Sequence, residues 1–156
     1  MRDTTFLNRM IAYDRWANAQ TRNSLVPVAR KAPKAVTLLA HIHTGWAAWM
    51  DRIGKIEREM DWFPELGLDE CEQLGEIAQS RWDSFMEGLP DNWPTIKYPA
   101  KLLDGSMSEF AIGDIVMQLV THGSHHRGQI NTLIRQAGGE PVNSTFMRFV
   151  VAGKEL

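Results

Sequence analysis

A chain of 156 residues is long enough to bury the core of one domain, and we predict a single domain over residues 1–156. Its 17 Lys and Arg residues nearly balance 19 Asp and Glu residues without forming a basic stripe, which argues against a nucleic-acid partner. The single cysteine, Cys71, excludes an intramolecular disulfide and fits a reducing cytoplasm. With no signal core and no apolar run of about 18 residues, we expect a cytoplasmic protein with no membrane partner.

Four long helices are predicted from apolar residues that recur at three- and four-residue steps. Their expected ranges are 4–23, 34–58, 69–88 and 112–137. Asp3 or Thr4 could cap the first helix, and Gly138 and Gly139, followed by Pro141, end the last one. The fold class is therefore all-α, a four-helix bundle.

The sequence pattern changes before the last long helix. Residues 95–98 and 106–110 alternate in polarity, and Asp104-Gly105 between them is a turn signal, which together predict a small β-hairpin. Residues from Ser144 onward predict one more short helix. Asp51 and Arg52, near the end of the second long helix, are expected on a solvated face.

Three of the five histidines, His122, His125 and His126, lie close together in the last long helix. Positions four apart on an α-helix lie about 40° apart around the axis, so His122 and His126 share a face. The apolar row of this helix, extended through the gap, passes over both residues and predicts that both face inward. That row comprises Ile112, Ile115, Val116, Leu119, Ile130, Leu133 and Ala137. His125 aligns with a polar row and is expected outside the site.

Two histidines at this spacing are often hydrogen-bonded core residues, so the spacing alone is weak evidence for a metal. Two imidazoles buried side by side nevertheless each need a polar partner, and one metal ion would satisfy both. Such a site needs a third ligand, and the remaining histidines are His41 and His43 on the second long helix. They flank the centre of its apolar row by about 100° on either side, so periodicity leaves the choice between them open.

These residues resemble the DinB-like family of damage-inducible, metal-binding bundles. The stretch from His122 to Ile130 looks like the family signature H-x-x-H-H-R-G-Q-[IL]. Residues 13–18, Tyr-Asp-Arg-Trp-Ala-Asn, are similar to its W-A-N segment, and residues 39–52 to its L-x-H…W-x-x-R helix. The likeness extends over nearly the whole chain.

The resemblance implies an up-down-down-up four-helix bundle, commonly a homodimer. It also implies that His41, His122 and His126 are the metal ligands and that His43 and His125 lie outside the site. Departures from the family pattern at residues 43–46 and 123–124 affect the expected shape of the pocket more than metal binding.

Three imidazoles suit Zn²⁺ or Ni²⁺ and leave a coordination position open for water or substrate. Some members of the wider superfamily resemble thiol-dependent transferases or isomerases. The likeness implies a small-molecule substrate with a low-molecular-weight thiol cosubstrate. Water bound to the metal would instead allow hydrolysis. Tyr13, Trp16, Asn18 and Gln129 are candidates for the pocket or for polar partners of the ligating histidines, although Tyr13 and Trp16 are of a type found more often in the core.

A second class of function remains open, a non-catalytic stress-response or binding protein that a metal ion stabilises. A three-ligand site with an open position favours a metal-dependent enzyme. The sequence shows no recognisable general acid or base beside the site, and the catalytic residues are therefore unknown.

Overall fold

The computed structural model describes residues 4–57, 59–102 and 104–153. Its long helices are α1 (Thr4–Leu25), α2 (Pro33–Ile53), α3 (Leu68–Glu87) and α4 (Ile112–Gln136). The shorter elements are the 3-10 helices η1 (Ala29–Lys31) and η2 (Trp93–Thr95), the strands β1 (Lys97–Lys101) and β2 (Met107–Ala111), and the helix α5 (Phe146–Val151). None of the described helices is long and apolar enough to cross a membrane.

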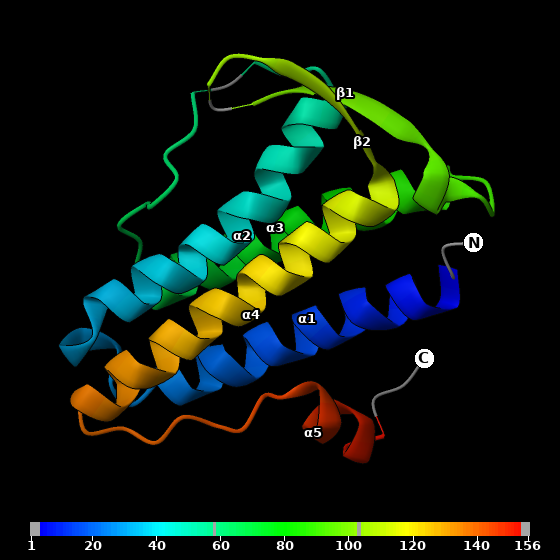
Figure 1. Cartoon of the computed structure of the whole chain (residues 1–156). Helices are drawn as coiled ribbons and strands as arrows, with labels where there is room; N and C mark the ends of the chain where they lie inside the picture. Colours follow the sequence, from blue (N-terminus) through cyan, green and yellow to red (C-terminus); the bar gives the residue numbers. More distant parts are fainter. Residues whose placement is uncertain (1–3, 58, 103, 154–156) are drawn as a thin grey trace.

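The four long helices form a bundle in which α1 and α4 run in one direction and α2 and α3 in the other (Figure 1). Helix α4 packs against both α1 and α2, and α3 packs against α2. Since α2 and α3 are parallel neighbours, residues 54–67 must return along the bundle before α3 begins. The predicted helical bundle with a small hairpin is confirmed.

The sequence predicted the ends of α1, α3 and α4 to within two residues, but the predicted end of α2 is wrong. This helix stops at Ile53, followed by Gly54 as its C-cap and by Lys55 with a φ of 54°. A residue in the left-handed region cannot continue a right-handed helix, so Ile56, which falls inside the predicted range 34–58, lies beyond the helix and is exposed. The predicted end at residue 58 and the alternative cap at Asp3 lie outside the described residues.

The hairpin is confirmed, with β1 and β2 antiparallel and Lys97 opposite Ala111. Its first strand begins two residues later than predicted, because Thr95 belongs to η2. Gly105 has a φ of 87°, which a glycine adopts without strain in a tight turn. The hairpin packs beside the end of α2, where the rings of Trp49 and Phe110 lie 5.6 Å apart. The hairpin therefore lies against the C-terminal part of α2.

Two hydrophobic clusters fill the two ends of the bundle. The cluster nearer the hairpin includes Trp46, Trp82, Ile112 and Val116. The cluster nearer the α1–α2 connection includes Leu25, Leu39, Ile130 and Ile134. Between them, the middle parts of α1, α2 and α4 carry the buried polar residues Asp14, Asn18, His41, His43 and Arg127. The candidate site lies in this central polar layer.

Candidate metal centre

The side chains of His41 from α2 and of His122 and His126 from α4 converge on one point. Nε2 of His122 lies 3.1 Å from Nε2 of His41 and 3.1 Å from Nε2 of His126. One ligand nitrogen from each of the three rings lies within 4.8 Å of the other two. Tetrahedral zinc with Zn–N bonds of about 2.0–2.1 Å holds two ligand nitrogens about 3.3 Å apart, so the three rings fit one such ion with small adjustments.

Two of these histidines are oriented through their second ring nitrogen. Nδ1 of His41 lies 2.5 Å from the carbonyl oxygen of Trp62, and Nδ1 of His126 lies 2.7 Å from Oε1 of Gln129. Both partners are oxygen acceptors, so each Nδ1 carries a hydrogen and donates it. Each Nε2 is then left with a free lone pair toward the common point, which is the tautomer a metal ligand requires.

The surroundings keep the rings on α4 uncharged. Burial lowers the pKa of His122 to about 4, and the neighbouring His126 and His41 contribute to the lowering. Burial also lowers the pKa of His126, against the hydrogen bond to Gln129, which raises it. Near neutral pH both rings are therefore neutral, and neutral imidazoles are the form that coordinates a divalent cation.

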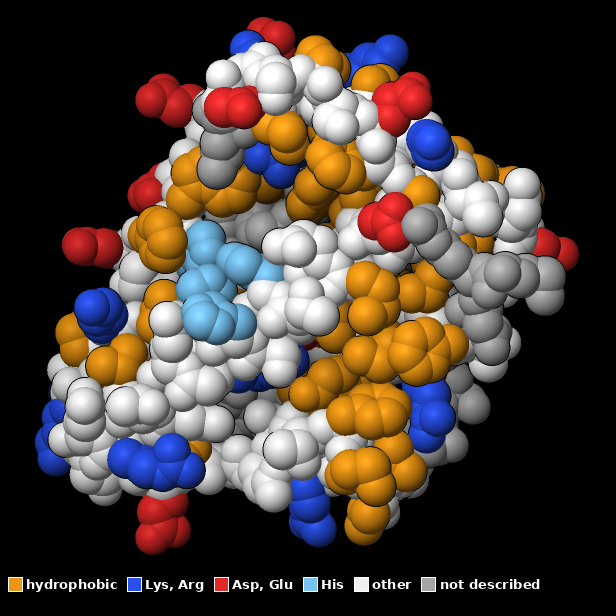
Figure 2. Space-filling model, viewed as in Figure 1, with side chains coloured by type: hydrophobic (Ala, Val, Ile, Leu, Met, Phe, Trp, Pro, Cys, Tyr) orange, Lys and Arg blue, Asp and Glu red, His pale blue; other side chains and the backbone are white. Residues whose placement is uncertain are grey.

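A recess of about 610 Å³ opens beside His41 and His122. Its other lining residues are Gly45, Trp49, Arg52, Trp62, Phe63, Leu102, Gln118 and Leu119. Figure 2 shows the histidines grouped at the molecular surface, next to a hollow with largely hydrophobic walls. A ligand in this recess would therefore have direct access to two of the three histidines.

The sequence profile of the DinB family matches residues 1–154. The chain belongs to the DinB family. It is also similar to Protein DinB of Bacillus subtilis (strain 168), with 21% identity over 153 residues that cover 85% of this chain and 87% of the relative. No solved structure gives a significant match. Family membership and the three-histidine cluster are together compatible with metal binding.

The two remaining histidines of this DinB-family chain lie outside the cluster. His43 packs against α3 at Gly75, where an added Cβ would lie 2.8 Å from the imidazole ring. Burial lowers the pKa of His43 to about 4, and the charge of Arg127 contributes. His125 is exposed on α4. The structure thus brings His41, and not His43, to the two histidines of α4.

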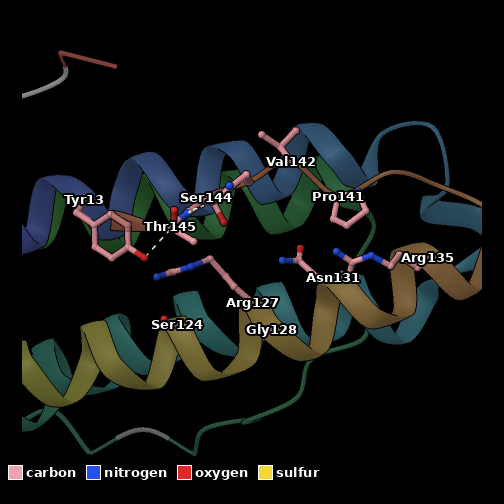
Figure 3. Close-up of a pocket in the computed structure, with 11 residues that line it drawn as sticks. Tyr13, Ser124, Arg127, Gly128, Asn131, Arg135, Pro141, Val142, Ser144 and Thr145 are labelled. Carbon is pink, nitrogen blue, oxygen red and sulfur yellow. Dashed lines mark hydrogen bonds between the residues drawn. The ribbon is translucent and has the colours of Figure 1, made fainter. Parts of the chain in front are cut away.

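The four residues predicted as pocket or partner groups are placed differently from one another. Gln129 contacts His126 directly. Tyr13 lies in another cavity, of about 400 Å³, between α4 and the segment that precedes α5 (Figure 3). Its hydroxyl donates to the carbonyl oxygen of Ser144 at 3.2 Å, away from the histidines.

Trp16 and Asn18 also lie away from the lining of the recess. The ring of Trp16 packs against that of Phe149 in α5, with centroids 5.7 Å apart. The amide of Asn18 donates to Asp14 at 3.1 Å, within the central polar layer. Trp16 is thus an aromatic residue packed against the core, and Asn18 belongs to a buried hydrogen-bond network.

Arg127, the neighbour of His126, is the centre of that network and is only 3% exposed. Its Nη1 donates to Oδ1 of Asp14 at 2.6 Å and to Oδ1 of Asn18 at 2.7 Å. Nε1 of Trp46 donates to Oδ2 of Asp14 at 3.1 Å. Burial raises the pKa of Asp14, and the guanidinium of Arg127 opposes that rise. The network ties α4 to α1 and α2 at the level of the metal centre.

The expectation that Asp51 and Arg52 lie on a solvated face is wrong for Asp51, whereas Arg52 is half-buried. Asp51 is 3% exposed and accepts a hydrogen bond from Arg81 of α3 at 2.6 Å. Arg52 lines the recess, with its guanidinium over the rings of Trp49 and Trp62. The spacing of Trp49 and Arg52, three residues apart, was a signal that the two share a helix face.

Proposed function

We propose that the protein binds one divalent metal ion through His41, His122 and His126 and uses the open side of that ion for chemistry on a small molecule. The observation that carries the proposal is the recess, because it reaches two of the three histidines and has the volume of a small-molecule site. Membership in the DinB family supports metal binding.

Three imidazole ligands favour Zn²⁺ or Ni²⁺. Such an ion would supply Lewis acidity and would favour the deprotonated form of a water or thiol that occupies its open position. The carbonyl of Trp62 and the amide of Gln129 keep the rings of His41 and His126 in the ligating orientation. The recess walls would exclude water around a bound substrate and orient it toward His41 and His122.

The reaction class that fits best is transfer to or from a low-molecular-weight thiol cosubstrate, or hydrolysis. A thiol cosubstrate is supported by the wider superfamily of DinB-like proteins, some members of which resemble thiol-dependent transferases or isomerases. A recess with mostly apolar walls suits the apolar part of an electrophilic substrate.

One observation favours the alternative, a non-catalytic protein that its metal stabilises. Among the described residues that line the recess there is no carboxylate, cysteine, lysine or tyrosine, and both lining histidines belong to the metal cluster. A separate general acid or base is therefore missing from these walls. Chemistry at this site would rely on the metal ion and the cosubstrate.

The metal site is tested by elemental analysis of purified protein. We expect about one divalent ion per chain, and loss of most of it in His41→Ala, His122→Ala and His126→Ala. His125→Ala, in the same helix, and His43→Ala, two residues from His41, are the matched controls and should retain the ion. Unchanged occupancy in His122→Ala, or equal loss in His41→Ala and His43→Ala, would contradict the site.

Catalysis is tested by screening the metal-loaded protein with small thiols, electrophiles and esters. The proposal expects turnover that falls to background in His122→Ala and returns in the wild type when metal is restored after chelation. Metal binding without thiol affinity and without turnover would favour the non-catalytic alternative.

A further inference from the structure

Arg52 is the cationic side chain among the described residues that line the recess. Its guanidinium carbon lies 5.0 Å from the ring centroid of Trp49 and 5.4 Å from that of Trp62. Two indole rings at these distances attract the guanidinium through their faces. These contacts place the guanidinium in the wall of the recess, where its N–H donors can meet a ligand.

No ion pair or hydrogen bond to a protein acceptor holds the Arg52 guanidinium within the part of the chain that the structure describes. In contrast, Arg81 and Arg127 each have an aspartate partner. Arg52 is half-buried, and this burial lowers its pKa. A cation that is partly removed from water without a counter-charge is costly, and an anionic ligand would supply that charge.

The rest of the recess is suited to an apolar group. Its walls include Trp49, Trp62, Phe63, Leu102 and Leu119. Burial of an apolar body against such walls provides affinity, and one fixed charge among them provides orientation.

We propose that this recess binds an amphiphilic organic anion, with a carboxylate on Arg52 and an apolar body against the aromatic and leucine walls. A guanidinium binds a carboxylate through two parallel N–H···O hydrogen bonds, so Arg52 would fix both the position and the direction of the ligand. The inference deepens the proposed function, since it names the substrate or cosubstrate class for the same recess. The Arg52 subsite itself does not require a metal ion.

The test compares three probes of nearly equal shape, 3-phenylpropionate, 3-phenylpropanamide and 3-phenylpropylamine, by calorimetry on the chelated, metal-free chain. The expected result is that the acid binds about ten- to a hundredfold more tightly than the amide, as for hydrogen bonds to charged groups, and that the amine binds most weakly. Equal affinity of acid and amide, or no binding of any probe at millimolar concentration, would overturn the proposal.

Arg52→Gln should remove the preference for the acid and leave the affinity for the amide nearly unchanged. Arg52→Lys should restore part of the preference, because it returns the charge without the two-pronged geometry. Arg135→Gln removes an exposed positive charge from α4, outside the recess, and should leave the preference intact. Circular dichroism and metal content of Arg52→Gln show whether its fold and metal site are preserved.

A repeat with metal-loaded wild type and with His122→Ala separates this inference from the proposed function. If neither protein binds metal but the acid preference persists and depends on Arg52, the metal proposal fails and the anion subsite stands. If metal binds, but the acid preference disappears on chelation and survives Arg52→Gln, the carboxylate was binding the metal ion and the Arg52 subsite is wrong.

Discussion

Gly123 lies beside the polar layer, between the two ligand histidines of α4. A Cβ at this position would lie 2.7 Å from Oδ1 of Asp14 and 2.9 Å from Nη1 of Arg127. The missing side chain therefore lets the Asp14–Arg127 pair form against the backbone of α4. That pair holds the face of α4 that carries Arg127 toward α1, while His122 and His126 face His41 of α2.

At the residue scale, we predict that Gly123→Ala lowers the free energy of unfolding by about 1–3 kcal/mol, because a methyl group there overpacks the buried pair. Urea denaturation monitored by circular dichroism measures the change. Gly128→Ala is the matched control in the same helix, since a Cβ there meets nothing within 4 Å. It should be stabilising by about 0.5–1 kcal/mol through helix propensity. If Gly123→Ala raised the free energy of unfolding as Gly128→Ala is expected to, the close approach at Gly123 would have no energetic weight.

At the element scale, two different structural devices orient the ligands. On α4, Gln129 lies one helical turn beyond His126 and accepts from its Nδ1. On α2, the acceptor for His41 is the carbonyl of Trp62, in the connection that returns along the bundle to α3, and Phe63 in the same connection stacks on the His41 ring at 4.1 Å. The parallel arrangement of α2 and α3 thus brings this connection over the metal centre.

We predict that Gln129→Ala weakens metal affinity by about ten- to a hundredfold, since loss of the acceptor frees both the tautomer and the rotation of the His126 ring. A competition titration with a chromogenic chelator measures the affinity. Gln136→Ala, at the exposed end of α4, is the control and should match the wild type. A wild-type affinity for Gln129→Ala would mean that this hydrogen bond plays no part in ligand orientation.

At the scale of the whole molecule, the metal centre joins α2 to α4 midway between the two hydrophobic clusters. A metal ion that binds the folded chain and not the unfolded one adds stability by mass action. The increment is about 2.7 kcal/mol when the free ion is at a hundred times its dissociation constant.

We therefore predict that chelation lowers the midpoint of thermal unfolding by about 5–10 °C, as measured by differential scanning fluorimetry. His122→Ala should unfold at the same temperature with and without added metal. Equal midpoints for the metal-loaded and chelated wild type would mean that the ion does not bridge the two helices.

The homodimer stays a prediction that sedimentation analysis would test. Exposed Phe6, Met147 and Val151 lie on α1 and α5, where Figure 2 shows many hydrophobic side chains.

Local patterns predicted most of the fold because helix periodicity and turn residues act over a few neighbours. The row through Ile112, Val116 and Ile130 predicted the buried face of α4, and these residues are indeed buried. The end of α2 was missed because Gly54 alone is a weak signal for a helix end. The left-handed conformation of Lys55, which ends the helix, cannot be recognised from its residue type. Asp51 was misjudged because its partner, Arg81, is on another helix 30 positions away.

By itself, the sequence determined that His122 and His126 share one face of a helix, because α-helix geometry fixes the relation of positions four apart. It left His41 and His43 equivalent, about 100° to either side of the apolar row of α2. The family resemblance implied His41, and the tertiary structure supplies the physical reason, since α2 packs against both α4 and α3. His43 fills the space that Gly75 leaves on α3, and His41 meets the two histidines of α4.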